Sequence, residues 1–169
     1  MKFKSPSWDA TPKDVAEFRQ ANAHHLEKMR GVLLDHVLEL ATLPGLEDGL
    51  IEEYVYDKND HILRLVLLCG YLQMGYYDLI ITYQGAEISP EHEETLKHFA
   101  QSIDEHICLH RFEVDITEDN QIEHRLEFFT SDGKVWFAIR CEGLSWETVE
   151  RPKQEFSPRP SRFYPDRTS

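Results

Sequence analysis

The sequence predicts an α+β fold in which a mostly antiparallel sheet packs against a long N-terminal helix and a second helix at about 90–105. Three observations lead to this prediction. Residues 108–149 form a meander of alternating strands joined by short turns, two segments begin with helix-capping sequences, and tight connections between strands favour antiparallel pairing. We expect one α+β domain over residues 1–150 and a Pro/Arg-rich C-terminal tail over residues 151–169.

The first helix is predicted to begin at residues 11–14, where a Thr cap is followed by Pro and then by an acidic residue. Apolar residues recur every three or four positions, except at Asn22, and Pro44-Gly45 ends the segment. An unbroken helix over residues 12–42 would be about 45 Å long, against a radius of gyration of about 15 Å for a domain of this size. The helix therefore breaks near Gly31, runs the full length of the sheet, or reaches a partner subunit.

Three strands are predicted between the two helices. Residues 50–56 and 61–69 are β-rich runs joined by a short polar turn, and residues 76–83 form a third run. The second run is nearly all apolar, which is typical of a central strand covered on both faces. Ser89-Pro90 then begins the second helix by the same capping logic as the first.

The first hairpin of the meander has a register that the sequence specifies. Residues 108–116 and 122–128 alternate with period two, and the run between them is rich in turn-forming residues. A turn centred on Asp119 sets apolar residues opposite one another on one face and opposite charges on the other. The predicted pairs are Ile116–Ile122, Val114–His124, Phe112–Leu126, Arg111–Glu127 and Glu113–Arg125. Cys108 and His110 join the core face in this pattern.

The second hairpin is predicted to turn at Asp132-Gly133, which suits a two-residue type I′ turn. That turn pairs Phe128 with Phe137, Leu126 with Ile139, and His124 with Cys141. The face opposite the core is interpreted as a solvated lattice of ion pairs, each contributing little to stability. Its members are Arg111, Glu113, Glu123, Arg125, Glu127 and Arg140. Residues 144–149 are expected to add a last edge strand.

Charge and composition limit the classes of partner and the compartment. The net charge is -13, and the tail over residues 151–169 has five basic and two acidic residues, which leaves -16 on the body. Such a body disfavours nucleic acid and favours a basic protein partner, or simply solubility. The chain has no long apolar run, so we expect no membrane association. The start of the chain lacks a signal-like apolar stretch and there are three cysteines, so we expect a cytoplasmic protein with reduced thiols.

Two sets of aromatic residues are candidates for a contact or ligand surface. The first set is Tyr-rich and lies around the connection between the second and third strands. It consists of Tyr71, Met74, Tyr76, Tyr77 and Tyr83, and ordinary packing of the sheet is the alternative interpretation. The second set is Phe129 and Trp136, which the predicted register places opposite each other on the polar face of the meander. Such a pair is either capped by another segment, for example the C-terminal tail, or forms part of a contact surface.

Metal binding and catalysis have weak support in the sequence. His110, His124 and Cys141 could share the buried face of the meander, but with no fourth ligand the default interpretation is core residues, so we predict no metal and no cofactor. The chain has no Gly-x-Ser-x-Gly elbow and no phosphate-binding glycine loop. We therefore predict no catalytic residue and favour a protein that is not an enzyme.

Three hypotheses for function remain open. The first is a non-enzymatic protein-interaction or accessory module, of which an inhibitor or immunity protein for a basic toxin is one concrete version. The alternative is a small-ligand-binding domain or an enzyme, with a pocket lined by Tyr residues and His110 or His124. The third is self-association into a homodimer through the helix over residues 12–42.

Overall fold

The computed structural model describes residues 11–71, 75–102 and 107–151. Within these ranges the chain forms three helices and seven strands, and every strand pairing is antiparallel. The elements are α1 (Pro12–Met29), α2 (Asp35–Leu40), β1 (Leu50–Asp57), β2 (Ile62–Tyr71), β3 (Gly75–Gln84), α3 (Pro90–Gln101), β4 (Cys108–Ile116), β5 (Ile122–Thr130), β6 (Gly133–Cys141) and β7 (Gly143–Glu150). The predicted α+β class with a mostly antiparallel sheet is confirmed.

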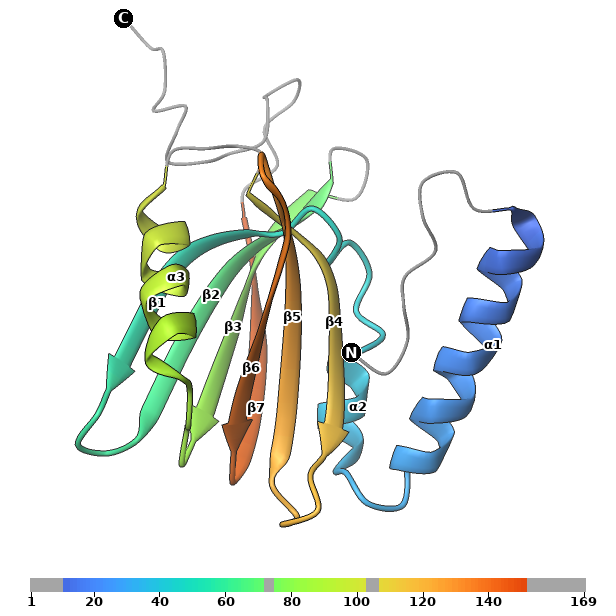
Figure 1. Ribbon diagram of the computed structural model, residues 1–169, viewed down its shortest axis with the longest axis horizontal. Coiled ribbons are helices and arrows are strands. Elements are labelled where there is room, and N and C mark those ends of the chain that lie inside the picture. The colour runs from blue at the N-terminus through green and yellow to red at the C-terminus, as the bar shows by residue number, and fades with distance from the viewer. Residues whose placement is uncertain (1–10, 72–74, 103–106, 152–169) are drawn as a thin grey trace, which may run out of the picture.

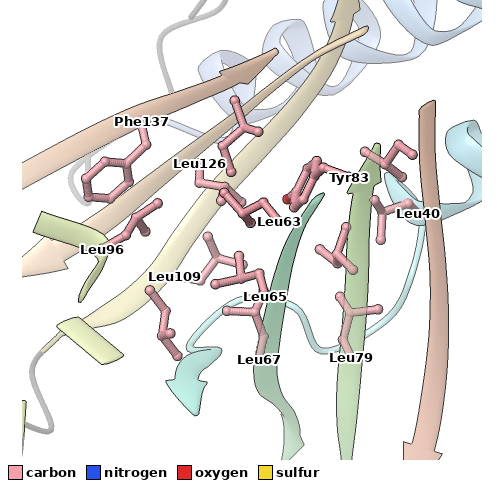
Figure 2. Close-up of a cluster of buried hydrophobic side chains, with 14 of the residues drawn as sticks. Leu40, Leu63, Leu65, Leu67, Leu79, Tyr83, Leu96, Leu109, Leu126 and Phe137 are labelled. Atoms are coloured by element: carbon pink, nitrogen blue, oxygen red, sulfur yellow. The ribbon is translucent and has the colours of Figure 1, made fainter. Parts of the chain in front are cut away.

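The strands form two sheets that share one hydrophobic core. Sheet A has the order β1-β2-β3-β7, and sheet B has the order β4-β5-β6. Figure 2 shows Leu63 of sheet A next to Leu126 of sheet B, and Leu65 of sheet A next to Leu109 of sheet B. Helices α2 and α3 add to the same core, since Leu40 and Leu96 are fully buried. In Figure 1, α3 lies in front of β1 and β2, whereas α1 stands beside β4 at the other side of the molecule.

The first helical segment is broken, so of the three predicted outcomes the break near Gly31 is confirmed. Helix α1 ends at Met29, residues 30–34 form a turn, and α2 begins at Asp35. The break has a packing consequence. The short α2 buries Val37 and Leu40 in the core, whereas the only buried residue of the longer α1 is His25.

Sheet A matches the prediction of a central, doubly covered strand. Strand β2 lies between β1 and β3, and both its inward Leu67 and its outward Leu68 are buried. The last strand, β7, is present, but it pairs with β3 rather than with β6. The two sheets are linked where Glu87, just after β3, forms an isolated backbone bridge with Arg140 of β6.

The two hairpin registers have different outcomes. All five predicted β4–β5 pairs are confirmed. The predicted β5–β6 register is wrong by two residues, because Phe128 pairs with Val135 and Leu126 with Phe137. The turn residues are Ser131 and Asp132, neither of which has positive φ, and Gly133 follows them at φ 127°. The backbone thus forms a type I-like turn with Gly at its last position instead of a type I′ turn. A two-residue shift leaves every side chain on its predicted face.

A β-bulge overturns the predicted face of Cys108 and His110. The β4–β5 register shifts between Leu109 and Arg111, so one extra residue stands opposite β5. Leu109 is therefore the buried core residue at this end of β4, and Cys108 and His110 are only half-buried. A prediction that assumes strict alternation cannot place this shift. The extra residue reverses which side chains face the core on one side of the bulge.

The outer face of sheet B, meaning the face turned away from the core, is not a solvated lattice as predicted. Glu113, Asp115 and Glu123 are buried there, with 4–7% of their surfaces exposed. The charges are paired as expected, but the carboxylates are shielded from water. This correction matters for function, because shielded charges keep fixed positions that solvated charges do not.

Candidate functional site

Arg125 is the centre of a charge network on the outer face of sheet B. Its guanidinium lies 3.8 Å from Glu113 and 3.9 Å from Asp115, and its Nε donates to Glu123 at 2.6 Å. Glu123 also accepts a hydrogen bond from Nε of Arg140 at 2.9 Å. The register explains this convergence, since Glu113 stands directly opposite Arg125, and Glu123 directly opposite Arg140.

Glu123 is suited to holding a charge rather than to transferring a proton. Burial alone would raise the pKa of Glu123, but the hydrogen bonds from Arg140 and Arg125 outweigh burial and lower that pKa. Glu123 therefore stays ionised near neutral pH. A carboxyl group with a lowered pKa is a poor general acid or base at neutral pH.

A cleft lies on this face above Ala138, and we call it the Trp136 cleft. It has a volume of about 720 Å³. Its lining consists of Glu87, Ile88, Ser89, His92, Glu123, Arg125, Trp136, Ala138 and Arg140. Ala138 makes the hollow: it is a small residue between Trp136 and Arg140 on the outer face of β6, and it stands opposite Arg125. The segment before α3 forms the remaining wall.

The walls of the Trp136 cleft combine an aromatic surface with acidic groups. Trp136 is 51% exposed, and its ring meets the His92 ring edge-on at 5.6 Å. Glu87 stands beside Arg140 through their backbone bridge. Within the described parts of the chain, the exposed Glu87 of this lining forms no ion pair, whereas Glu123 is paired with Arg125 and Arg140.

Phe129 and Trp136 were both predicted to be exposed, and this is confirmed at 37% and 51%. They are not opposite each other, however, because the corrected register pairs Phe129 with Lys134. Phe129 is partly covered by His110, whose ring centroid lies 4.1 Å away, and by the ammonium group of Lys134 at 4.9 Å. The predicted capping by residues 151–169 falls almost wholly outside the described residues.

The Tyr-rich set does not form one surface. Tyr76 and Tyr77 line a hollow of about 310 Å³ next to Pro44, whose carbonyl accepts a hydrogen bond from the Tyr77 hydroxyl at 2.5 Å. Burial raises the pKa of Tyr77, so its hydroxyl stays protonated. Tyr71 lines a different groove together with His110. Met74 lies outside the described residues.

The residues proposed as metal ligands are not brought together. His124 is fully buried in the core, where its Nδ1 is 2.8 Å from the Tyr83 hydroxyl, and burial lowers its pKa to about 3. Cys141 pairs with Ile122 rather than with His124, and burial raises its pKa to about 12. His110 is displaced by the bulge. Among the residues that the structure describes, no group of three or more His, Cys, Asp or Glu is arranged to hold a metal ion.

Sequence reasoning missed the residues that shape the Trp136 cleft. His92 carried no signal, because it is one of nine histidines. A signal for Ala138 did exist in the alternation of β6, where a small side chain falls between Trp136 and Arg140 on the polar face. Only the tertiary contact with the segment at residues 87–92 turns that gap into a cleft.

The comparisons with known proteins found no similar protein. No family model matches the chain, and neither the curated proteins nor the solved structures contain a match. In the described part of the chain, no helix has the length and apolar character needed to span a membrane.

Proposed function

We propose that this protein is a non-enzymatic interaction module that binds a basic segment of a partner protein through the Trp136 cleft. One observation carries the proposal: a cleft in which a half-exposed Trp forms one wall and Glu87, which forms no ion pair within the described residues, belongs to the lining. An inhibitor or immunity protein for a basic toxin remains one concrete form of this function.

The charges around the cleft favour a cationic side chain. Arg125 is surrounded by the carboxylates of Glu113, Asp115 and Glu123, so its charge is compensated. The lining adds Glu87, which forms no ion pair within the described residues, whereas the charge of Arg140 is paired with Glu123. A lysine or arginine that enters above Ala138 would therefore meet the carboxylate of Glu87 beside the ring of Trp136.

Trp136 supports the same partner chemistry. A cation held over an indole face gains about 0.5–2 kcal/mol, and Trp is among the residues that most often dominate binding energy at interfaces. The net charge of -13 would also attract a basic partner from a distance and increase its association rate at low ionic strength. Aromatic contact and long-range attraction thus favour the same kind of partner.

The test is a fluorescence anisotropy titration of fluorescein-labelled nona-arginine into the full chain. Ala138→Leu fills the hollow without removing any charge, so we expect it to weaken binding at least about tenfold, equivalent to about 1.4 kcal/mol. The control is Ala23→Leu on the exposed face of α1, which makes the same change elsewhere and should leave affinity unchanged. Equal affinity for all three proteins would contradict the proposal, because it would show attraction to net charge alone.

Self-association through residues 12–42 stays a prediction. Helix α1 buries only His25, and Val32 and Leu34 in the turn that follows it are 58% and 68% exposed. Light scattering coupled to size exclusion would detect a dimer. If one forms, Leu34→Glu should return it to the monomer.

A further inference from the structure

Strand β4 is an edge strand of sheet B, and part of its backbone has no partner. The Thr117 N–H donates to the Gln121 carbonyl at 2.9 Å at the end of the β4–β5 hairpin. Because bonded and non-bonded positions alternate in an antiparallel ladder, Asp115 and Glu113 bond to β5. The N–H and C=O groups of Phe112 and Val114 therefore point away from the sheet.

The two ends of this edge are occupied and the middle is open. At one end Leu109 exchanges backbone hydrogen bonds with Asp48 and Gly49, both at 2.7 Å. At the other end the Val114 carbonyl lies 3.3 Å from Nε2 of His25, on α1. Between them, the N–H and C=O of Phe112 have no hydrogen-bond partner among the residues that the structure describes.

A groove of about 560 Å³ runs along this open edge, and we call it the β4 groove. Phe18 and Asn22 of α1 line one side, and residues 109–112 of β4 line the other. Tyr71 and the loop over residues 43–48 close one end. That loop packs tightly on β2, since a Cβ at Gly45 would lie only 3.0 Å from the Cα of Gly70.

The polar groups of the β4 groove are suited to a peptide backbone. Asn22 interrupts the apolar stripe of α1, and its amide makes no hydrogen bond to the described part of the chain. His110 also lines the groove, but its Nε2 faces Glu127 of β5 at 3.7 Å and its ring packs on Phe129, so we assign it no contact with the peptide. The Asn22 amide can donate to a C=O group and accept from an N–H group of an extended chain.

We propose that the β4 groove takes an extended peptide segment of a partner protein, which adds to sheet B as a fourth strand beside β4. Phe112 would exchange both backbone hydrogen bonds with the segment, and Asn22 would hold it from the opposite side. A strand is favoured over a compact metabolite because the unpaired N–H and C=O of Phe112 match a ladder position. Glu47, exposed at the end of the groove, favours a segment that carries a basic residue there. This proposal does not depend on the Trp136 cleft, which lies on β5 and β6.

The test is selection of a phage-displayed random dodecapeptide library on the full-length protein. We expect a family of binding peptides whose affinity falls at least about tenfold for Asn22→Leu, which fills the groove and removes the amide. Asn22→Leu restores the apolar stripe of α1, so folding should be retained, and circular dichroism checks this. The matched control is Gln20→Leu on the exposed face of the same helix, which should bind like the native protein.

Backbone recognition is tested on the selected peptides. N-methylation at the residues that pair with Phe112 should abolish binding, whereas N-methylation at the alternate residues should change it less than about threefold. The proposal is overturned if no peptides are selected or if Asn22→Leu binds them equally well. It is also overturned if the native protein forms a dimer that Asn22→Leu disrupts, because the occupant would then be a second copy.

Discussion

The two faces of sheet B are formed by the same strands but are stabilised by different interactions. The core face buries Phe128, Phe137 and Ile139 together with the polar His124. Nδ1 of His124 bonds to the Tyr83 hydroxyl, whereas its Nε2 has no hydrogen-bond partner among the described residues. The outer face buries carboxylates and compensates them with Arg125 and its neighbours. On the first face burial itself is stabilising, whereas on the second each buried charge is costly unless its partner stays in place.

This difference supports the outer face of sheet B as the location of the proposed binding site. An apolar face that is completely packed has no surplus surface for a partner. The outer face keeps a half-exposed Trp136 and a cleft over Ala138 while its charges are held rigidly below. Rigid, compensated charges give a binding surface a fixed shape, which reduces the entropy lost on association.

The largest expected effect comes from the core face. Phe137→Ala should reduce the free energy of unfolding by about 3–5 kcal/mol, because the ring is fully buried against Phe99 and Phe128. Its sequence neighbour Trp136 points to the other face, and Trp136→Ala should cost less than about 1 kcal/mol. Urea denaturation of both variants measures the difference. Similar losses for the two would mean that the faces are not distinct.

The charge network should produce the next largest effect. Arg125→Gln leaves Glu113, Asp115 and Glu123 close together without their shared cation, so we expect a loss of about 3 kcal/mol at pH 7. Part of the loss should disappear in acid, because the hydrogen bonds from Arg140 and Arg125 that lower the pKa of Glu123 stabilise only its ionised form. The control is Arg64→Gln, which removes an exposed pair with Glu53 and should cost less than about 0.5 kcal/mol. Equal losses would show that the outer network is solvated after all.

A smaller effect should appear as a pH dependence of the core face. Burial lowers the pKa of His124 from the ordinary 6.5 to about 3. Below pH 6.5 the unfolded chain therefore binds a proton at His124 that the folded chain does not bind. The free energy of unfolding consequently falls as the pH decreases from 6.5 towards 3. Between pH 7.5 and pH 5 we expect a loss of about 2 kcal/mol from this residue, measured by urea denaturation at each pH.

Two variants isolate the contribution of His124. His124→Leu should be less stable at every pH because the Tyr83 hydroxyl loses its partner, but most of the pH dependence above pH 5 should disappear. His98→Gln, on the exposed side of α3, should keep the slope of the native protein. An unchanged slope in His124→Leu would show that the imidazole is already protonated in the fold.

Much of the fold could be predicted because it depends on local patterns. Capping residues placed the starts of α1 and α3, and period-two alternation placed the faces of β4, β5 and β6 almost throughout. The β5–β6 register failed because Asp-Gly is compatible with more than one turn, and Thr130 stabilises the observed one. Its hydroxyl donates to the Gly133 carbonyl and accepts from the Asp132 N–H.

The remaining features depend on contacts between distant segments. The bulge at His110 is set where Leu109 pairs with Asp48 and Gly49, about sixty residues away in the chain, and alternation carries no sign of it. The burial of Glu113 and Glu123 likewise depends on tertiary packing, since the same alternating sequence is compatible with a solvated face. Trp136 and Phe129 were recognised as exposed, but the cleft required Ala138 and the wall at His92.

The most direct test of the account is a ¹H–¹⁵N correlation NMR titration of the full chain with nona-arginine at physiological salt. The account predicts saturable shifts at the Trp136 indole and at the amides of His92 and Ala138, with little change at the β7 amides. Shifts spread evenly over acidic surfaces such as Glu147 and Glu150, with none at Trp136, would contradict it. Attraction to the net charge would then explain the binding, and the outer face of sheet B would have no part in recognition.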